Sequence, residues 1–405
     1  MRMITAGRAV ALGALALTIA GATALPAQAA TGTHPSSHVR VCGPPAKGMV
    51  ACDAIRNDAA PVRSSATSLP NGYGPTQLQS AYGLTSTAGA GRTLAIIDAY
   101  DAPTAAKDLA VYRTTYGLPG CAGTPTSDAI GTCTFKKVNQ TGGTRMPKAN
   151  AGWAQETSLD LDMASAICPN CSILLVEADS ASLADLSTAV TTAVRLGATV
   201  VSNSYGGSEP SASAAYDSAY SSTKAVITAS TGDGGYGVSY PASAPGVIAV
   251  GGTSLTMSGT TRVGETAWSG AGSGCSTAFD QPSWQGAAVG TACGSKRAVA
   301  DVSAVADPST GVAVYDSTRY QGRAGWMVFG GTSASSPIIA GTYALAGGPP
   351  ADGAGAHLYA NTSSLHDVSG GSNGSCSTVA AQLCTAGTGW DGPTGLGTPN
   401  GLGAF

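Results

Sequence analysis

The chain has 405 residues, of which 43% are hydrophobic and 11% charged, and its formal net charge is -3. This length and apolar content support a sizeable core, so disorder throughout the chain is excluded. The small number of charged residues leaves no basic surface, which argues against nucleic acid as a partner.

The first 29 residues have the three parts of a secretory signal peptide. Arg2 and Arg8 give a positively charged N-terminal region, and the apolar run Ala9 to Leu25 follows. Ala27-Gln28-Ala29 supplies the small residues of a cleavage site. A membrane anchor is the alternative, but the apolar run is shorter than the roughly 20 residues that span a bilayer. We therefore expect a secreted, extracellular protein that has no membrane attachment in its mature form.

Ten cysteines in an exported chain favour disulfide bonds. Their order along the chain suggests five bridges that each close a short loop. The expected pairs are Cys42 with Cys52, Cys121 with Cys133, Cys168 with Cys171, Cys275 with Cys293, and Cys376 with Cys384. The spacing of Cys168-Pro-Asn-Cys171 also occurs in redox motifs, but no thioredoxin-like pattern surrounds it, so we interpret this pair as structural.

Residues 30–68 are rich in Thr, Ser, Pro and Ala and have no sustained helix or strand period. We interpret them as a short N-terminal segment or vestigial propeptide. From residue 69 onward, apolar strands alternate with helical stretches, which is typical of an α/β fold with a parallel sheet covered by helices on both faces. No fixed repeat is visible, so residues 69–405 are expected to form one domain.

Five strands are predicted from apolar runs, at Thr93 to Ala99, Ser172 to Glu177, Thr199 to Ser204, Ala225 to Ala229 and Val247 to Val250. Helices are predicted at Ala102 to Tyr116, Trp153 to Ala166, Leu183 to Leu196, Ser211 to Ser222 and from Ser333 to Leu345. Pro337 fits the last helix only if it lies in the first turn.

The segment Gly330-Gly331-Thr332-Ser333-Ala334-Ser335-Ser336-Pro337 turns from a strand-like run into a helix. This geometry exposes Ser333 at a helix N-terminus, where backbone amides favour the negative charge that develops in acyl transfer. A simple helix cap is the alternative interpretation, because serine is preferred at that position anyway.

A serine needs a base, and the chain has only four histidines. His34 and His38 lie in the leader, and His357 and His366 lie in a turn-rich tail after Ser333. None has the helix-opening His-Gly context of subtilisin-like enzymes. A Ser-His-Asp triad is therefore disfavoured, although spatial proximity is not readable from sequence.

Carboxyl groups offer the replacement. Glu156 and Asp160 are four residues apart in a predicted helix, so they share one face. In a closed site they would share a proton, which lets Glu156 act as a general base and then as an acid. A solvated helical face is the alternative for an isolated pair of this kind. Asp162 points about 200° away from Asp160 and is the expected bystander.

A further acid, Asp233, follows the strand Ala225 to Ala229 in Thr231-Gly232-Asp233. Carboxyl ends of strands are where open α/β sheets place ligands. A protonated Asp233 could donate a hydrogen bond to an oxyanion, whereas the alternative is an aspartate that stabilises a turn.

Together these motifs resemble the sedolisins, the serine-carboxyl peptidases that share a fold with subtilisin. The resemblance runs from about Gly72 to Phe405. It implies a subtilisin-like fold and peptide-bond hydrolysis. An acidic working pH is expected, because Asp233 must be protonated to donate and the acid pair functions best while it shares a proton. By resemblance the base and its partner fall on Glu156 and Asp160, the oxyanion acid on Asp233 and the nucleophile on Ser333. The segment Ser202 to Gly207 looks like the family's substrate-binding strand.

The tail resembles the sedolisin calcium site and implies one structural Ca²⁺. The implied ligands are the carboxylates of Asp367 and Asp391 and the carbonyls of Val368, Gly387 and Gly389. Such hard oxygen ligands suit Ca²⁺, and glycines allow carbonyls to converge. A glycine-rich turn with two surface acids is the alternative.

The sequence thus predicts a secreted, monomeric serine endopeptidase that acts on proteins or peptides. One departure from the family stands out, because only about 40 residues separate the signal from the catalytic region, whereas sedolisins usually carry a long prosegment. Two alternatives stay open. One is a histidine-dependent subtilisin-like peptidase, and the other is a catalytically impaired sedolisin-fold binding protein.

Overall fold

The structure is a computed structural model that describes residues 1, 3, 37–61, 69–85, 87–209 and 214–405. The chain divides into Met1–Ser36 and a compact unit over Ser37–Phe405, and only the second is described below. Apart from residues 1 and 3, the expected signal peptide lies outside the described residues. Every helix among the described residues is too short or too polar to span a bilayer.

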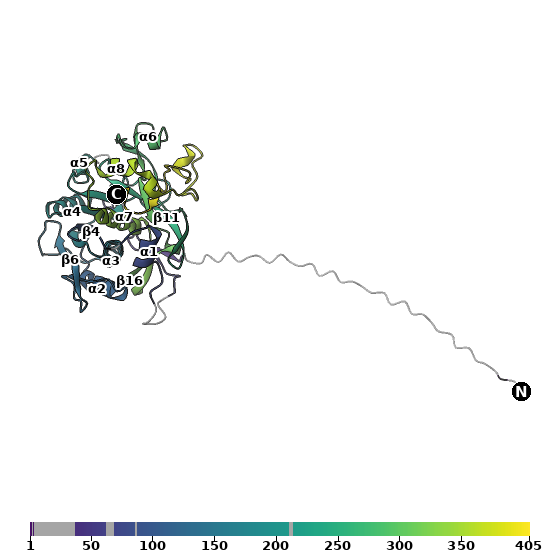
Figure 1. Cartoon of the computed structure of the whole chain (residues 1–405), viewed down its shortest axis with the longest axis horizontal. Helices are drawn as coiled ribbons and strands as arrows, with labels where there is room; N and C mark the ends of the chain where they lie inside the picture. The colour runs from purple at the N-terminus through teal and green to yellow at the C-terminus, as the bar shows by residue number, and fades with distance from the viewer. Residues whose placement is uncertain (2, 4–36, 62–68, 86, 210–213) are drawn as a thin grey trace. The chain divides into compact units, whose positions relative to one another are not determined.

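A nine-stranded sheet forms the centre of the compact unit (Figure 1). Its strands follow the order β12-β11-β10-β8-β4-β7-β6-β5, and β15 also pairs with β11. All pairs are parallel except that of β11 with β12. The bounds are β4 (Thr93–Ala99), β5 (Gly120–Ala122), β6 (Ile130–Asn139), β7 (Ser172–Ala178), β8 (Val200–Asn203), β10 (Val226–Ser230), β11 (Ile248–Ser258), β12 (Thr261–Ala267) and β15 (Val302–Val305).

The five predicted strands are all present, and the prediction for Thr93–Ala99 matches β4 residue for residue. These strands read as continuous apolar runs because helices cover both of their faces. The missed strands are shorter or interrupted by polar and glycine residues. The predicted α/β class is confirmed.

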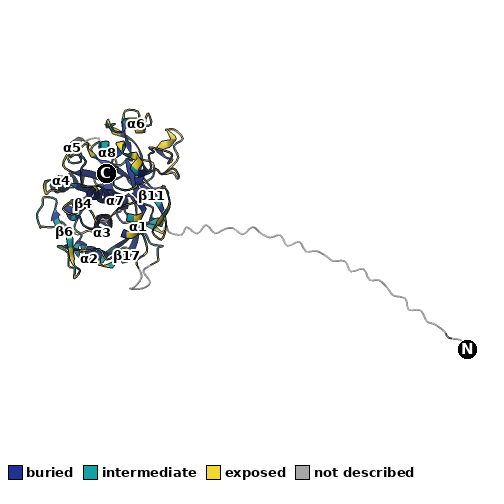
Figure 2. Ribbon diagram, viewed as in Figure 1, coloured by how far each residue is buried: buried dark blue, intermediate teal, exposed yellow. Residues whose placement is uncertain are grey.

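Two long helices lie at the middle of the unit. α3 (Ala151–Ile167) packs against α7 (Thr332–Ala346), and α7 crosses β8, β10, β11 and β15. α3 and α4 both contact β4. Figure 2 shows α3 and α7 in the buried colour. The other helices are α1 (Pro75–Ala81), α2 (Ala105–Thr115), α4 (Leu183–Arg195), α5 (Ala214–Asp217), α6 (Gly286–Val289) and α8 (Ala354–Ala360).

Two helix predictions need correction. The helix expected at Ser211 to Ser222 is only α5, although residues 210–213 lie outside the described part. Ser222 explains its early end, because the side-chain oxygen accepts hydrogen bonds from the backbone nitrogens of Lys224 and Ala225 and forms a turn instead.

Pro337 is the second correction, since it is the sixth residue of α7 and lies beyond the first turn. A proline there leaves the carbonyl four residues earlier, that of Ser333, without its helical donor. The hydroxyl of Ser204 donates to this carbonyl at 3.3 Å and compensates.

A second sheet of four antiparallel strands has the order β1-β3-β17-β16, and β2 pairs with β9. Residues 37–57 thus contain three short strands that the sequence pattern did not indicate. The bounds are β1 (His38–Arg40), β2 (Ala51–Cys52), β3 (Ile55–Asn57), β9 (Tyr205–Gly206), β16 (Val312–Tyr320) and β17 (Arg323–Gly330). Four further strands form two small antiparallel pairs, β13 (Gly274–Asp280) with β14 (Lys296–Val299) and β18 (Leu365–His366) with β19 (Thr398–Pro399).

All five predicted disulfide pairs are confirmed. Their Cα–Cα separations run from 4.7 to 5.8 Å, within the ordinary range for bridged cysteines. The described residues contain no free cysteine.

Candidate active site

The predicted serine and acids meet where α3 packs against α7. Glu156 and Asp160 lie one turn apart on α3, and Ser333 is the second residue of α7. The side chain of Asn150 accepts hydrogen bonds from the first turn of α3 and fixes its start. All three predicted groups are fully buried. The predicted helix therefore does place both acids on the face directed at the serine.

The backbone turn before Ser333 requires a glycine. Gly331 has a φ of 91°, in the region that favours glycine. A Cβ there would lie 1.9 Å from the carbonyl oxygen of Asp53 and 2.6 Å from Oδ2 of Asp233. The missing side chain therefore leaves a place at the start of α7 that a carbonyl oxygen and a carboxyl group both reach.

Ser333 and Ser204 are joined by two hydrogen bonds. Oγ of Ser333 donates to the carbonyl of Ser204 at 3.1 Å, and Oγ of Ser204 donates to the carbonyl of Ser333. Ser204 lies between β8 and β9, in the segment predicted to bind substrate. The serine is thus held against that segment.

Glu156 and Asp160 are buried acids with no hydrogen-bond partner of good geometry and no ion pair among the described residues. Burial, then the charges of Asp160 and Asp98, raise the pKa of Glu156 well above its usual value, and the nearby Ser333 hydroxyl partly opposes this rise. Burial and Asp98 likewise raise the pKa of Asp160. The pair therefore retains protons at pH values at which exposed carboxyl groups ionise.

Asp98 is a third acid of this cluster that sequence reasoning missed. It is fully buried near the end of β4, and burial raises its pKa to about 7. Neither of its carboxyl oxygens has a hydrogen-bond partner of good geometry. An acid inside an otherwise apolar run, at the carboxyl end of a parallel strand, was the available signal.

Asp233 has one satisfied oxygen and one free oxygen. Oδ1 accepts from the backbone nitrogen of Thr332 at 2.7 Å and from its hydroxyl at 2.9 Å. Oδ2 is the atom beside Gly331, and it has no partner among the described residues. Burial, followed by the charge of Asp53, raises the pKa of Asp233 well above its usual value. A proton on this group therefore belongs on Oδ2, which points into the place left by Gly331.

Comparison with known proteins agrees with this geometry. The model of the subtilase family (Peptidase S8) matches residues 131–348, more than half of the chain. Kumamolisin from Bacillus sp. (strain MN-32) is 33% identical over 300 residues, which cover 65% of this chain and 53% of kumamolisin. The structure of Pseudomonas sedolisin, a serine-carboxyl proteinase complexed with two molecules of pseudo-iodotyrostatin, matches with a TM-score of 0.67 and 26% identity over 82% of this chain and 96% of that chain.

The chain belongs to the subtilase family and, within it, to the sedolisins. Sedolisin from Pseudomonas sp. (strain 101) is 37% identical over 181 residues, covering 40% of this chain and 29% of that relative. The chain thus spans about half the length of kumamolisin and less of sedolisin. The subtilisin-like fold that the motifs implied is confirmed.

The remaining predicted groups of this sedolisin lie away from the serine. Oδ2 of Asp162, the expected bystander, accepts from the backbone nitrogen of Tyr315 in β16. His357 pairs with Asp352 at 3.1 Å, and His366 lies in β18. No contact between Ser333 and a histidine is found among the described residues, which exclude His34.

The residues of the expected calcium site converge on one short loop. Oδ2 of Asp367 accepts from the nitrogen of Gly389, and Oδ2 of Asp391 accepts from that of Gly387, each at 3.0 Å. Burial raises the pKa of Asp391 to about 7, and the charge of Asp367 adds to the rise. Val368 follows Asp367 directly and is buried. The two carboxylates at this loop are oxygen donors of the kind that a hard cation prefers, and both are bound here by glycine backbone nitrogens.

Proposed function

We propose that the protein is a secreted serine-carboxyl peptidase that hydrolyses peptide bonds of proteins. The observation that carries this proposal is the buried group of Ser333, Glu156 and Asp160, beside the free carboxyl oxygen of Asp233. The family supports protein or peptide substrates. The disulfide bonds agree with an oxidising compartment such as the cell exterior.

In the proposed reaction, Oγ of Ser333 attacks the substrate carbonyl and Glu156 accepts its proton. Asp160 positions Glu156 and shares its proton, and Oδ2 of Asp233 donates to the oxyanion. Glu156 then returns the proton to the leaving nitrogen, and water cleaves the acyl-enzyme by the same steps. The Ser333 hydroxyl, which donates to Ser204 in the resting structure, rotates toward Glu156 to begin.

Acidic working conditions follow from the directions of the pKa shifts. Asp233 donates only while protonated, and the acid pair shares a proton only below its raised pKa values. Activity therefore falls as the pH rises and these protons are lost.

The test is a pH-activity profile on an unfolded protein substrate for the parent, Ser333→Ala and Glu156→Ala. Ser335→Ala is the matched control, because its hydroxyl bonds to the carbonyls of Ala304 and Val305, away from the acids. We expect Ser333→Ala to lose activity and Ser335→Ala to retain it. Undiminished cleavage by Ser333→Ala would refute the assignment.

One structural Ca²⁺ is proposed for the tail, held by the carboxylates of Asp367 and Asp391 with the carbonyls of Val368, Gly387 and Gly389. When bound, it would neutralise two neighbouring acids and tie the two segments together. Chelation should therefore lower the melting temperature of the parent, and added Ca²⁺ should restore it. Asp391→Asn should melt at a temperature that Ca²⁺ does not change. A parent insensitive to both treatments would contradict the site.

A further inference from the structure

The turn that carries Asp233 is bound by a distant segment of the tail. Residues 231–237 follow β10, and Gly235 within this turn has a φ of 74°, in the region that favours glycine. Such an irregular stretch lacks the hydrogen-bond ladder of a sheet, so its backbone groups need partners in the segments around it. Two of these segments are residues 270–273 and the tail at Asn373. The position of Asp233 therefore depends on both of them.

Residues 270–273 bind one side of the turn through the backbone. The nitrogen of Gly272 donates to the carbonyl of Gly232 at 2.8 Å. Ser273 exchanges two hydrogen bonds with Gly237, at 2.8 and 3.1 Å. Because Gly232 precedes the acid of the turn and Gly237 follows it, these bonds hold the turn on both sides of its acid.

Asn373 binds the turn and residues 270–273 at the same time. Its backbone carbonyl accepts from the nitrogen of Tyr236 at 3.0 Å. Its Nδ2 donates to the carbonyl of Ala271 at 2.6 Å and to Oγ of Ser273 at 2.7 Å. A Cβ on Gly235 would lie 2.6 Å from the same Asn373 carbonyl oxygen, so the tail and the turn are in direct contact. Asn373 is 4% exposed, and loss of its side chain would leave buried polar groups without a partner.

A disulfide bridge holds Asn373 against the turn. Asn373 precedes Cys376 by three residues, and its nitrogen donates to the carbonyl of Cys384, the partner of Cys376, at 2.9 Å. Oγ of Ser273 donates to the carbonyl of Leu383 at 2.6 Å. The covalent bridge and these hydrogen bonds therefore fix the same loop of the tail.

The side chain of Asp233 needs a well-placed backbone because one of its oxygens has no partner. Oδ1 accepts from Thr332, whereas Oδ2 has no partner among the described residues and lies beside the place left by Gly331. A group that donates to an oxyanion has to be held within about 0.5 Å of its working position. A misplacement of about 1 Å can lower a rate by about 10²-fold. The direction of Oδ2 is set by the bonds of Oδ1 together with the backbone of the turn.

We infer that Asn373 is a positioning residue for Asp233, the proposed oxyanion acid, because it holds the turn at residues 231–237 in the shape that directs Oδ2 to the oxyanion. The inference rests on the proposed function. It makes the catalytic rate depend on a side chain 140 positions later in the chain than Asp233. The Cys376–Cys384 bridge contributes to the same effect, since it holds Asn373.

The test is a double-mutant cycle on the full chain, with kcat and KM measured on an unfolded protein. The four members are the parent, Asn373→Leu, Asp233→Ala and the double variant, and Ser333→Ala is the inactive reference. Leucine is close to asparagine in shape but has neither donor nor acceptor. We expect Asn373→Leu to lower kcat/KM by about 10–10²-fold. KM should be nearly unchanged, because Asp233 donates only in the transition state.

The double variant distinguishes positioning from a general loss of folded protein. Asp233→Ala removes one oxyanion donor, which typically costs about 10²–10³-fold and leaves a measurable rate. If Asn373 acts through Asp233, its replacement costs little once Asp233 is absent. The double variant and Asp233→Ala should then agree within about twofold. A loss of folded protein would instead lower the rate by the same factor in both backgrounds.

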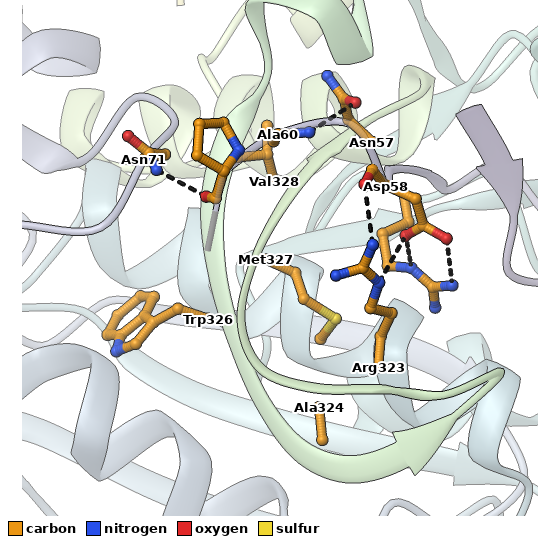
Figure 3. Close-up of a pocket in the computed structure, with 11 residues that line it drawn as sticks. Asn57, Asp58, Ala60, Asn71, Arg323, Ala324, Trp326, Met327 and Val328 are labelled. Carbon is orange, nitrogen blue, oxygen red and sulfur yellow. Dashed lines mark hydrogen bonds and ion pairs between the residues drawn. The ribbon is translucent and has the colours of Figure 1, made fainter. Parts of the chain in front are cut away.

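Asn71→Leu is the matched control. The side chain of Asn71 also donates to a backbone carbonyl, that of Pro61 at 2.7 Å, but it does so at the pocket beside β17 (Figure 3). In the described part of the chain, no hydrogen bond joins Asn71 to residues 231–237. We expect this variant to keep the kcat/KM of the parent.

Two disulfide variants test the bridge and decide the matter if Asn373→Leu does not fold. Cys376→Ser with Cys384→Ser leaves Asn373 in the chain but releases its loop. Cys121→Ser with Cys133→Ser opens a loop of similar length at β5 and β6, with a sequence separation of 12 against 8. Rates are compared per folded molecule, with the folded fraction taken from urea unfolding. We expect the first variant to lose kcat/KM and the second to retain it.

The outcomes separate this inference from the proposed function. A parent that cleaves unfolded protein through Ser333, together with an Asn373→Leu variant of equal kcat/KM, overturns the inference and leaves the peptidase standing. Equal losses from the Asn373 change with and without Asp233 also overturn it, as do equal rates in the two disulfide variants. A parent that does not cleave unfolded protein contradicts both.

Discussion

Asp301 and the pair Glu156 and Asp160 are equally buried in this sedolisin, but they differ in their hydrogen-bond partners. Asp301, which precedes β15, is fully buried and accepts hydrogen bonds from Arg297, Gln285 and Tyr359, each at 2.9 Å. Glu156 and Asp160 are equally buried, but none of their four carboxyl oxygens has a partner of good geometry among the described residues.

The difference separates an acid that stabilises the fold from acids available for chemistry. Burying a charge is unfavourable unless a partner compensates for the lost water. Asp301 has a cation and several donors, so its hydrogen-bonding capacity is used within the fold. Glu156 and Asp160 lack both, so each favours its protonated form and can exchange that proton with a reacting group.

The largest expected effect comes from Glu156→Gln, which keeps the shape of the side chain and removes its basicity. Loss of a general base typically lowers the rate by about 10²–10⁴-fold, so kcat/KM on an unfolded protein should fall by that factor. Stability at neutral pH should not fall, because the amide removes the unfavourable ionisation of a buried acid.

Asp162→Asn is the control for this variant, since Asp162 is a buried acid of the same helix that bonds to Tyr315 instead. It should leave the catalytic rate nearly unchanged. Similar losses in the two variants would mean that any buried acid of α3 supports activity indirectly through the fold.

Arg297→Met tests the other side of the comparison, because Arg297 is the cation paired with the buried Asp301. It leaves the charge of Asp301 buried without its cation, which typically lowers the free energy of unfolding by about 3–5 kcal/mol. Urea unfolding measures the loss, and the double variant Arg297→Met with Asp301→Leu should recover much of it. If the single variant is as stable as the parent, Asp301 does not depend on its pairing and the contrast fails.

The smallest effect is expected from Asp98→Asn, which removes a charge beside the acid pair. Because the charge of Asp98 raises the pKa values of Glu156 and Asp160, the alkaline limb of the activity profile should move to lower pH. The maximal rate should change little. Asp316→Asn is the control, as Asp316 also has a pKa raised to about 7 by burial but does not influence the pair.

The same variant has a stability signature with a definite sign. The pKa of Asp98 rises from 3.8 to about 7 on folding, so the folded chain binds its proton more tightly. Asp98 therefore destabilises the fold increasingly as the pH rises from about 4 to about 7. Thermal melting across this range should fall less steeply in Asp98→Asn. A profile unchanged from the parent would contradict the burial of an unpaired acid.

Local patterns predicted much of this fold and site. The continuous apolar run Thr93–Ala99 was enough to define β4, and four-residue spacing placed Glu156 and Asp160 on one helical face. Local patterns do not predict contacts between segments that lie far apart in the sequence. Asp53 lies in a segment without periodicity, and only the folded chain brings it to Ser333, 280 positions later in the chain.

Asp98 and Pro337 illustrate two other limits. A strand pattern indicates that Asp98 is buried but not that two further acids from α3 surround it. Propensity alone places Pro337 in the first turn, whereas in the structure a hydroxyl from another segment compensates for the missing helical donor. Tertiary contacts override local preference at both positions.

The hydrogen bond from the Ser204 hydroxyl to the Ser333 carbonyl also helps to fix the position of Ser333. Pro337 leaves that carbonyl without its helical donor, and the hydroxyl of Ser204, between β8 and β9, donates to it instead. The position of Ser333 is consequently fixed by the segment between β8 and β9 as well as by its own helix. A change at Ser204 would therefore be felt at Ser333 directly, since the two residues are joined by a pair of hydrogen bonds.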